Sequence, residues 1–565
     1  MSVAILGGGP SGLFVYKNFV EAGRTDLEIH IFENKKQLGA GMPYSSEGAN
    51  PEHITNVSDN EIPEMVTSIE EWIQTIPEET LATYDIEKAK FNEYKVLPRL
   101  LFGKYLAAQF ELLLEKARKS GLETTVHLST NVIDITDNKS GKVDIETAQK
   151  DTMEFDCVIV CTGHKWPIKY EGNVPGYFDS PYPPAKLAIN VNHPVAIIGS
   201  SLTAIDAIRT LARNNGVFEK TKDGKLSFHT IKQSPEFKIV MHSRSGMLPA
   251  IRFHLEQPQV STDSLLTTQE IEKHIANNDG FLSLDFVFDK DFKEQFREKD
   301  SKFFEKIKDL SLEQFVESMM ELRERKEPFE LFKAEYLEAE KSIRKKESIY
   351  WKEMLAVLSF AMNYPAKYLS AEDMLRLQKV LMPLIAIVIA FVPQSSCEEL
   401  LALHDAGKLE IIPVGSDSIV EPEQSGGINY HYVDENGQQE VNYYQTFVDC
   451  VGQPHLSYED FPFKGLLKKK SIRRAKLQFK SAEEGQNRLK EKNDQVEKGP
   501  QGHYFLNVPG ITINDDFQIV DPSGKANQRI YIMAVPYIGG YNPDYSGLDF
   551  CDEASEKIVD SILRG

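Results

Sequence analysis

The fold is decided by residues 3–12, which read VAILGGGPSG. The four apolar residues at the start predict a short β-strand, and the glycines after them form a turn into a helical pattern that ends before Gly23. A second apolar strand is predicted over residues 27–32. A strand, a helix and a strand in this order predict a parallel sheet and therefore an α/β fold.

The spacing Gly7-x-Gly9-x-x-Gly12 is typical of a dinucleotide-binding turn. The first glycine permits the tight turn, the second lets a diphosphate approach the backbone, and the third lets helix and strand pack closely. The diphosphate then lies at the helix N-terminus, where free N–H groups and the helix dipole favour negative charge. Glu33, after the second strand, is placed to accept hydrogen bonds from ribose hydroxyls. The residues predicted to form this first site are Gly7, Gly9, Pro10, Ser11, Gly12 and Glu33.

A second strand, turn and helix begin at residues 195–204, which read VAIIGSSLTA. Serine and alanine replace the second and third glycines, so this turn alone is a weak signal. The next predicted strand, 237–241, leads into His242, Ser243 and Arg244, without an acid where Glu33 stands in the first unit. An arginine there suits the 2′-phosphate of NADP, and the alternative is a structural turn with a surface arginine. The residues predicted to form this second site are Gly199, Ser200, Ser201, Leu202, Thr203, Ser243 and Arg244.

Further stretches resemble the two-dinucleotide-binding FAD/NAD(P) flavoproteins, and among them the N-hydroxylating flavin monooxygenases. The resemblance spans roughly residues 1–260 and 385–565 and does not cover the stretch between them. It rests on residues 39–45 (GAGMPYS) with 53–57 (HITNV), 98–105, 156–164 (DCVIVCTGH), 243–249 (SRSGMLP) and 542–549 (NPDYSGLD).

This resemblance and the two unlike turns imply FAD at the first site and NADPH at the second. The hypothesis is that NADPH reduces the flavin, and that a flavin C4a-hydroperoxide, kept dry, then oxygenates a small amine-type nucleophile. The cofactor-binding residues that the resemblance adds are Gly41, Met42, Tyr44, Asn56, Arg99, Val132, Thr162, Gly163, Asp544, Ser546 and Gly547.

Asn56 and Arg99 are the predicted catalytic residues. Asn56 would hold the flavin or the nicotinamide amide, and the alternative is an asparagine that only shapes its loop. Arg99 would neutralise the FAD diphosphate or bind a substrate carboxylate, and the alternative is an exposed arginine at a helix start. Asp544, Ser546 and Gly547 would contact the ribityl chain or the flavin edge.

Other classes fit the sequence less well. None of the 5 cysteines forms a CxxC pair, which argues against disulfide reductases and zinc ribbons, and no metal-ligand spacing is present. Residues 174–182 depart from the FxGxxxHxxx(W/F) pattern of Baeyer–Villiger and dimethylaniline monooxygenases. Two alternatives stay open: an NADPH:acceptor reductase or oxidase that inserts no oxygen, and a flavin-binding scaffold or sensor whose middle helices bind a partner protein.

Composition limits the partners. A formal net charge of -21 argues against nucleic acid, whose phosphates require a basic surface. The longest apolar run, 380–393, is shorter than the ~20 residues of a membrane span and contains Pro383. No targeting segment is recognised at the start of the sequence. We therefore expect a cytoplasmic protein whose partners are a small-molecule substrate and O2.

The length of 565 residues requires more than one hydrophobic core. We predict two Rossmann-like dinucleotide-binding domains, for FAD and NADP, with a mostly helical insertion. The polar stretch 464–500 is expected to be a solvated loop or an exposed helix. The predicted divisions are 1–190 and 452–565 for the FAD domain, 191–261 and 386–451 for the NADP domain, and 262–385 for the insertion.

Overall fold

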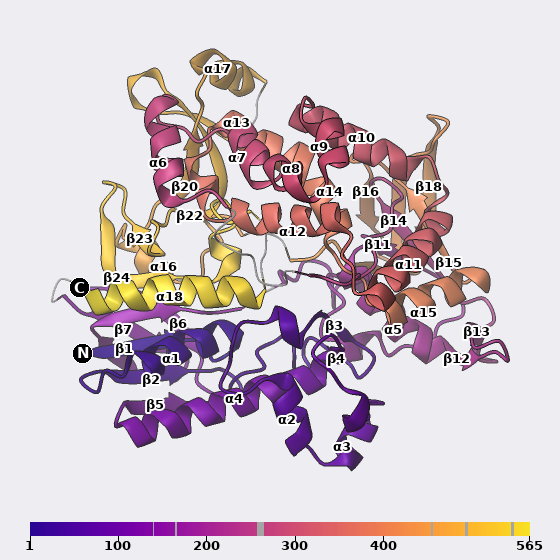
Figure 1. Cartoon of the computed structure of the whole chain (residues 1–565), viewed down its shortest axis with the longest axis horizontal. Coiled ribbons are helices and arrows are strands. Elements are labelled where there is room, and N and C mark those ends of the chain that lie inside the picture. Colours follow the sequence, from indigo (N-terminus) through magenta and orange to yellow (C-terminus); the bar gives the residue numbers. More distant parts are fainter. Residues whose placement is uncertain are drawn as a thin grey trace.

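The computed structural model describes residues 1–138, 141–163, 166–256, 265–453, 456–491, 495–543 and 547–564. Figure 1 shows two α/β bodies side by side, with the helices from the middle of the chain lying across both of them. The predicted fold class, two Rossmann-like units with a mostly helical region, is confirmed.

The first domain contains a six-stranded sheet. All neighbouring strands in it are parallel except the pair β23 and β24 at one edge. Because β24 comes from the end of the chain and pairs with β9, both chain ends build this sheet. The strands in spatial order are β23 (Gln518–Val520), β24 (Ala526–Ile532), β9 (Cys157–Val160), β1 (Ser2–Leu6), β2 (Glu28–Phe32) and β5 (Glu123–His127).

Three long helices pack with this sheet. The turn predicted at residues 7–12 leads into α1 (Pro10–Ala22), which lies alongside the last helix, α18 (Leu548–Arg564) (Figure 1). The third helix is α4 (Arg99–Ser120), which ends at Gly121 in the left-handed conformation. The starts of all three helices lie near the carboxyl end of β1, where a ligand of such a sheet is expected.

The second domain contains a five-stranded parallel sheet. Its core includes apolar side chains of α5 (Leu202–Asn215) and α15 (Gln394–Asp405). Residues 177–178 lie within the range expected for the first domain, yet they pair with β19 in this second sheet. The strands in spatial order are β10 (Tyr177–Phe178), β19 (Thr446–Asp449), β11 (Pro194–Ile198), β14 (Lys238–Ser243) and β15 (Leu409–Pro413).

The middle of the chain is helical and joins both domains. Apolar side chains of most of its helices are continuous with the core of the first domain, whereas Phe329 and Phe332 pack into the core of the second. The helices are α6 (Thr268–Asn277), α7 (Leu284–Asp291), α8 (Phe296–Lys299), α9 (Ser301–Ile307), α10 (Leu312–Glu324), α11 (Pro328–Lys345), α12 (Tyr350–Met362), α13 (Ala371–Arg376) and α14 (Met382–Val388).

Smaller elements surround the two parallel sheets. The antiparallel groups are β3 (Ile54–Ser58) with β4 (Val96–Pro98); β6 (Val132–Asp137), β7 (Val143–Thr147) and β8 (Thr152–Phe155); β12 (Gly216–Lys220) with β13 (Leu226–Thr230); β16 (Ile419–Pro422), β17 (Ile428–Val433) and β18 (Gln439–Tyr444); and β20 (Arg474–Gln478), β22 (Tyr504–Ile511) and β21 (Val496–Lys498). The short helices are α2 (Ile69–Thr75), α3 (Glu78–Ala82), α16 (Lys464–Lys468) and α17 (Ala482–Lys490).

The expectation for residues 464–500 is wrong in part. β20 alternates between the basic residues Arg474 and Lys476, which are half-buried, and Ala475 and Leu477, which are buried. This period of two is the pattern of a strand with one face on the core, and the high density of basic residues obscures it in the sequence.

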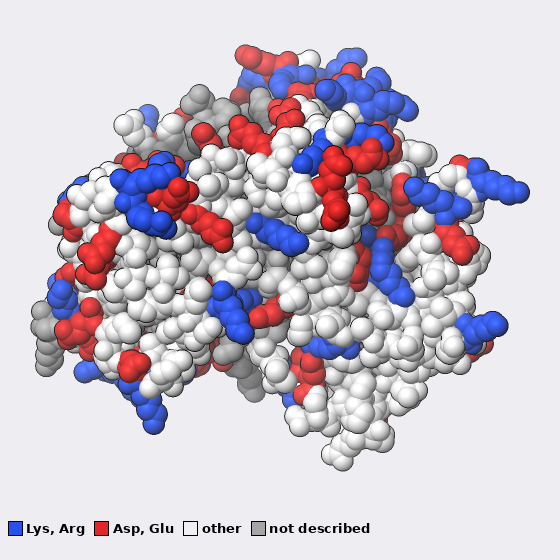
Figure 2. Space-filling model, turned by 90° about the horizontal axis from the view of Figure 1, so that it is seen from below, with Lys and Arg blue, Asp and Glu red and all other residues white. Residues whose placement is uncertain are grey.

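Charge is distributed over the surface in both signs. On the face seen in Figure 2, lysines and arginines lie among aspartates and glutamates. Within the described ranges, no helix is both long and apolar enough to cross a lipid bilayer.

Candidate functional site

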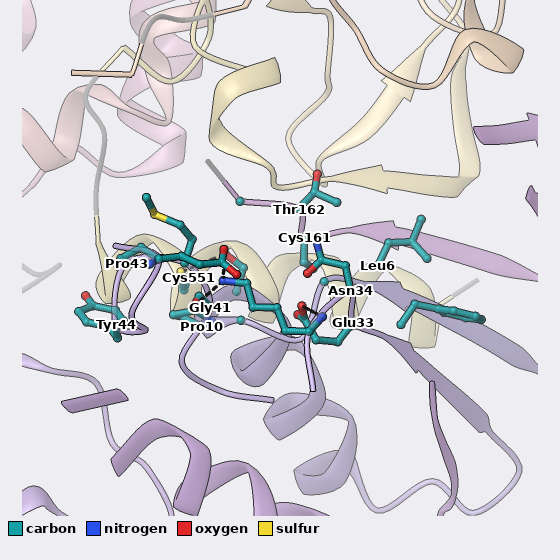
Figure 3. A pocket seen from close by; sticks show the side chains of 18 of the residues that line it. Leu6, Pro10, Glu33, Asn34, Gly41, Pro43, Tyr44, Cys161, Thr162 and Cys551 are labelled. Atoms are coloured by element: carbon teal, nitrogen blue, oxygen red, sulfur yellow. Dashed lines mark hydrogen bonds and ion pairs between the residues drawn. The ribbon is translucent and has the colours of Figure 1, made fainter. Parts of the chain in front are cut away.

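A cavity of about 490 Å³ opens at the carboxyl end of β1 and β2 in the first domain. Figure 3 shows Tyr44 and Pro43 toward one end of it and Glu33 and Asn34 toward the other. The predicted residues that line it are Gly7, Gly9, Pro10, Ser11, Glu33, Gly41, Met42, Tyr44, Asn56, Arg99, Val132, Thr162, Gly163 and Gly547. Asp544 and Ser546 lie outside the described residues. That the lining residues bind FAD stays a prediction.

The turn of the first site depends on contacts that exclude side chains. Gly7 has a φ of +111°, and a methyl group there would lie 2.6 Å from the carbonyl oxygen of Cys161. A methyl group on Gly12 would lie 2.0 Å from the carbonyl oxygen of Gly7. Gly12 does not line the cavity, but its lack of a side chain lets α1 pack closely against the turn and Ile5 of β1. Its part in a dinucleotide site stays a prediction. The N-cap residue of α1 is Gly9, which has no side chain to cap the helix, so the N–H groups of the first turn suit an anion.

Glu33 is held rigidly at the edge of the cavity. Its side chain is buried, with Oε2 accepting a hydrogen bond of 2.8 Å from the backbone N–H of Gly8 and Oε1 one of 2.9 Å from that of Lys35. These two donors fix the direction of the carboxylate. Its oxygens can accept further hydrogen bonds, as a ribose diol requires, although the protein backbone already occupies part of this acceptor capacity.

Lys35 also lines the cavity, and the sequence reasoning missed it. Its ammonium forms an ion pair of 2.8 Å with Glu47 and donates a hydrogen bond of 3.2 Å to the carbonyl of Gly41. It therefore connects the end of β2 to the loop after residue 39. Its position two residues after Glu33 is the signal that could have identified it.

The loop that carries Met42 and Tyr44 lies directly on α4. A methyl group on Gly103 of that helix would lie 2.1 Å from the carbonyl oxygen of Tyr44, so only glycine permits this approach. Tyr44 packs edge to face on Phe102, with ring centroids 4.8 Å apart. Burial raises the pKa of Tyr44 to about 12, so the phenol stays protonated and serves as a wall rather than a base.

Arg99 is not the exposed helix-start arginine of the alternative interpretation. Its guanidinium is largely buried and pairs with Asp206 of the second domain, at 2.5 Å between Nη1 and Oδ2. Burial would lower the pKa of Arg99, but the carboxylate of Asp206 outweighs it and the pKa is raised. Arg99 lines the cavity with much of its charge already compensated, which weakens the expectation that it neutralises a diphosphate.

The second site repeats the backbone of the first. The N–H of Gly7 donates to Phe32 at the end of β2, and that of Gly199 donates to His242 at the end of β14, both at 2.8 Å. Gly199 has a φ of +103°, and a methyl group there would lie 2.7 Å from the carbonyl oxygen of Cys450, as at Gly7 and Cys161. By this equivalence Ser243 stands where Glu33 does.

Arg244 follows Ser243 and is exposed, and no ion pair of Arg244 is found within the part of the chain that the structure describes. Ser201 precedes α5 without a side-chain cap, so the first turn with Leu202 and Thr203 presents free N–H groups. The hydroxyl of Ser200 donates a hydrogen bond of 2.9 Å to the carbonyl of Met247, and the hydroxyl of Ser243 accepts one of 2.9 Å from the backbone N–H of Gly246. Both hydroxyls are therefore engaged within the protein. The chemistry left for a ligand is a helix N-terminus and one guanidinium, which fits a phosphorylated dinucleotide.

Residues 4–165 match a family model described as FAD-NAD(P)-binding. This match confirms the predicted resemblance to FAD/NAD(P)-binding flavoproteins and the pairing of FAD with a nicotinamide dinucleotide. Residues 267–389, the helical middle of the chain, match a model described as the YdhS-like middle domain. Over 566 residues the chain is 27% identical to the uncharacterized protein YdhS of Escherichia coli (strain K12), covering 100% of this chain and 97% of that protein.

Two solved structures are similar along the whole chain. One is DfoA bound to FAD, the cadaverine monooxygenase of Erwinia amylovora, with 9% identity and a TM-score of 0.49 over 100% of this chain and 94% of that one. The other is L-lysine 6-monooxygenase from Pseudomonas syringae, with 10% identity and a TM-score of 0.48 over 100% and 99%.

The cysteines are not arranged for redox chemistry. All five are buried, and none forms a disulfide with another. Burial raises the pKa of Cys551, which lines the cavity, to about 12, and it likewise raises the pKa of Cys161 in the same wall. Both thiols are therefore protonated and unreactive near neutral pH.

Proposed function

We propose that the protein is an FAD-dependent monooxygenase that uses NADPH and O2 to oxygenate a small nucleophilic substrate of the amine type. The observation that carries the proposal is the repeated turn. Two domains present the same glycine geometry, one beside the buried carboxylate Glu33 and the other beside the exposed Arg244. A carboxylate suits the free ribose hydroxyls of FAD, and an arginine suits the 2′-phosphate of NADPH.

FAD, when bound, would supply the redox chemistry, as the group that accepts hydride and reacts with oxygen. The residues of this chain bind and orient it and keep water out. Glu33 would hold the ribose, and the uncapped start of α1 would hold the diphosphate. Tyr44, Met42 and Asn56 would form the wall around the ring system. Oxygenation is favoured over dithiol electron transfer because the chain has no CxxC pair and its cysteines are buried.

The test compares reduction with oxygen transfer. We expect purified protein to be yellow and its visible flavin band to bleach anaerobically with NADPH. With isotopically labelled dioxygen, one oxygen atom should then enter a member of a panel of small amines. Release of peroxide with every amine would indicate the reductase or oxidase alternative, and a flavin that NADPH cannot bleach would indicate the scaffold alternative.

Arg244→Ala is expected to lower the efficiency with NADPH by about ten- to a hundredfold, because a hydrogen bond to a charged group contributes about 1.5–3 kcal/mol. The efficiency with NADH should stay near the wild-type value. Steady-state reduction of the flavin with each nucleotide measures both. Lys232→Ala is the control, since it removes an exposed cation before β14, at the opposite end of the strand. Equal losses with both nucleotides would contradict the assignment of the 2′-phosphate to Arg244.

A further inference from the structure

Strand β3 forms part of the cavity wall but belongs to neither parallel sheet. Thr55 and Asn56 of this strand line the cavity. Its only partner strand among the described residues is β4, with the register pairs Ile54 to Pro98 and Ser58 to Val96. Backbone pairing alone therefore holds this wall weakly, because an isolated two-stranded ribbon is marginally stable.

The start of β3 is tied to α5 of the second domain. The backbone N–H of Arg99 donates a hydrogen bond of 2.8 Å to the carbonyl of His53. The Nε of Arg99 donates one of 3.3 Å to the carbonyl of Ile54. The guanidinium of Arg99 is itself held by Asp206 on α5. The imidazole of His53 is fully buried and lies 3.1 Å from the hydroxyl of Thr210 on the same helix.

The end of β3 is tied to the second domain by Arg252. This arginine is 6% exposed and donates from Nη1 to the carbonyl of Asn56 and from Nη2 to the hydroxyl of Ser58, the latter at 2.8 Å. It also forms a buried ion pair with Glu61, just after the strand. Its own carbonyl accepts a hydrogen bond of 2.6 Å from Gln394 of α15. Arg252 thus reaches from the second domain into the wall of the first.

We propose that Asp206 and Arg252, which both belong to the second domain, are positioning residues for FAD: they fix β3 and so the wall that Thr55 and Asn56 form. The inference rests on the proposed FAD site and assigns to it two residues that do not line its cavity. Buried ion pairs often add little net stability compared with apolar packing, so their use here is geometric. Both arginines donate hydrogen bonds to backbone carbonyls of β3, Arg99 to that of Ile54 and Arg252 to that of Asn56.

The test measures flavin binding in Asp206→Asn and Arg252→Lys. The apoprotein of each variant is titrated with FAD, and the visible circular dichroism of the bound flavin is recorded. We expect each variant to raise the Kd for FAD at least about tenfold and to change the flavin dichroism, because the wall shifts relative to the ring. Asp206→Glu, which keeps the charge, should restore part of the affinity. If Asp206→Asn does not fold, Arg252→Lys alone decides the test.

Glu399→Gln is the matched control. Glu399 is a buried carboxylate that pairs with Arg209 at 2.8 Å and Arg213 at 2.7 Å, within the second domain. Among the described residues it forms no hydrogen bond or ion pair with β3. It should lower the unfolding temperature and leave flavin binding unchanged. If the Asp206 and Arg252 variants behave like Glu399→Gln, the positioning role of these two residues is overturned, while the proposed FAD site still stands. If the wild-type apoprotein binds no FAD, the proposed function fails, and the inference fails with it.

Discussion

Gly7→Ala is expected to yield protein that is folded but colourless, because it no longer retains FAD. At a φ of +111° an alanine is strained, and its methyl group would lie 2.6 Å from the carbonyl oxygen of Cys161. Strain of this kind costs about 1–3 kcal/mol. No side-chain rotation relieves it, because an alanine methyl has no alternative rotamer and the atom it meets belongs to the backbone. The turn has to move away from β9, and that movement displaces the turn and the start of α1, where the diphosphate is proposed to bind. The measurement is the FAD content of the purified protein, with thermal unfolding as the check on the fold.

Gly199→Ala is the matched change at the second site, with a φ of +103° and a methyl group 2.7 Å from the carbonyl oxygen of Cys450. It should give a yellow protein whose flavin NADPH no longer reduces. The two variants carry the same added methyl and nearly the same strain, so a general loss of stability would affect them alike. Retention of FAD by Gly7→Ala, or loss of FAD from Gly199→Ala, would contradict the assignment of the two turns.

The two turns could be predicted from the sequence because their constraints are local. Each depends on a strand, a glycine and a helix start that follow one another within a few residues. The end of the next strand adds Glu33 in one unit and Arg244 in the other. Backbone sterics and hydrogen bonding at such a turn leave few alternatives, and the hydrogen bonds of Gly7 and Gly199 confirm the equivalence.

The contacts that connect the domains could not be predicted in the same way. Arg99 and Asp206 are 107 residues apart in the chain, and Arg252 and Glu61 are 191 apart. No spacing rule links residues so far apart in the chain, because periodicity and turn patterns are local. An arginine at a helix start has the same local pattern whether it faces water, a phosphate or an aspartate. The sequence predicts that the middle region is mostly helical. It does not predict that the apolar side chains of these helices are divided between the cores of the two domains.

Glu335→Ala is expected to destabilise the protein strongly, by about 3–5 kcal/mol, because it leaves buried cations without their partner. The carboxylate of Glu335 on α11 pairs with Arg323 of α10 at 2.6 Å and with Lys352 of α12 at 3.0 Å, and all three side chains are less than a tenth exposed. Arg323 also donates to the carbonyl of Leu248, which attaches these helices to the second domain. Equilibrium unfolding in denaturant measures the loss.

Glu338→Ala is the control for this triad. Glu338 pairs with the same Lys352 at 3.2 Å, but its side chain is 52% exposed. An exposed pair contributes about 0–1 kcal/mol, so this variant should stay close to the wild type. Equal losses for Glu335→Ala and Glu338→Ala would show that burial does not set the cost. Replacing the whole triad with apolar residues of similar volume should recover much of the stability, since no uncompensated charge is then buried.

The pH dependence of the same triad follows from its charges. Burial alone would raise the pKa of Glu335, but Lys352 and Arg323 outweigh it and hold the pKa below its ordinary value. A depressed pKa in the folded state means that the ionised carboxylate stabilises the fold fully above the unfolded value of about 4.3. That contribution is lost as the pH falls through the lower folded value. The difference in unfolding free energy between the wild type and Glu335→Gln should therefore be constant near neutral pH and narrow only below about pH 4. A difference that already closes between about pH 5 and 7 would mean that burial outweighs the two cations, and that Glu335 takes up a proton in the folded protein.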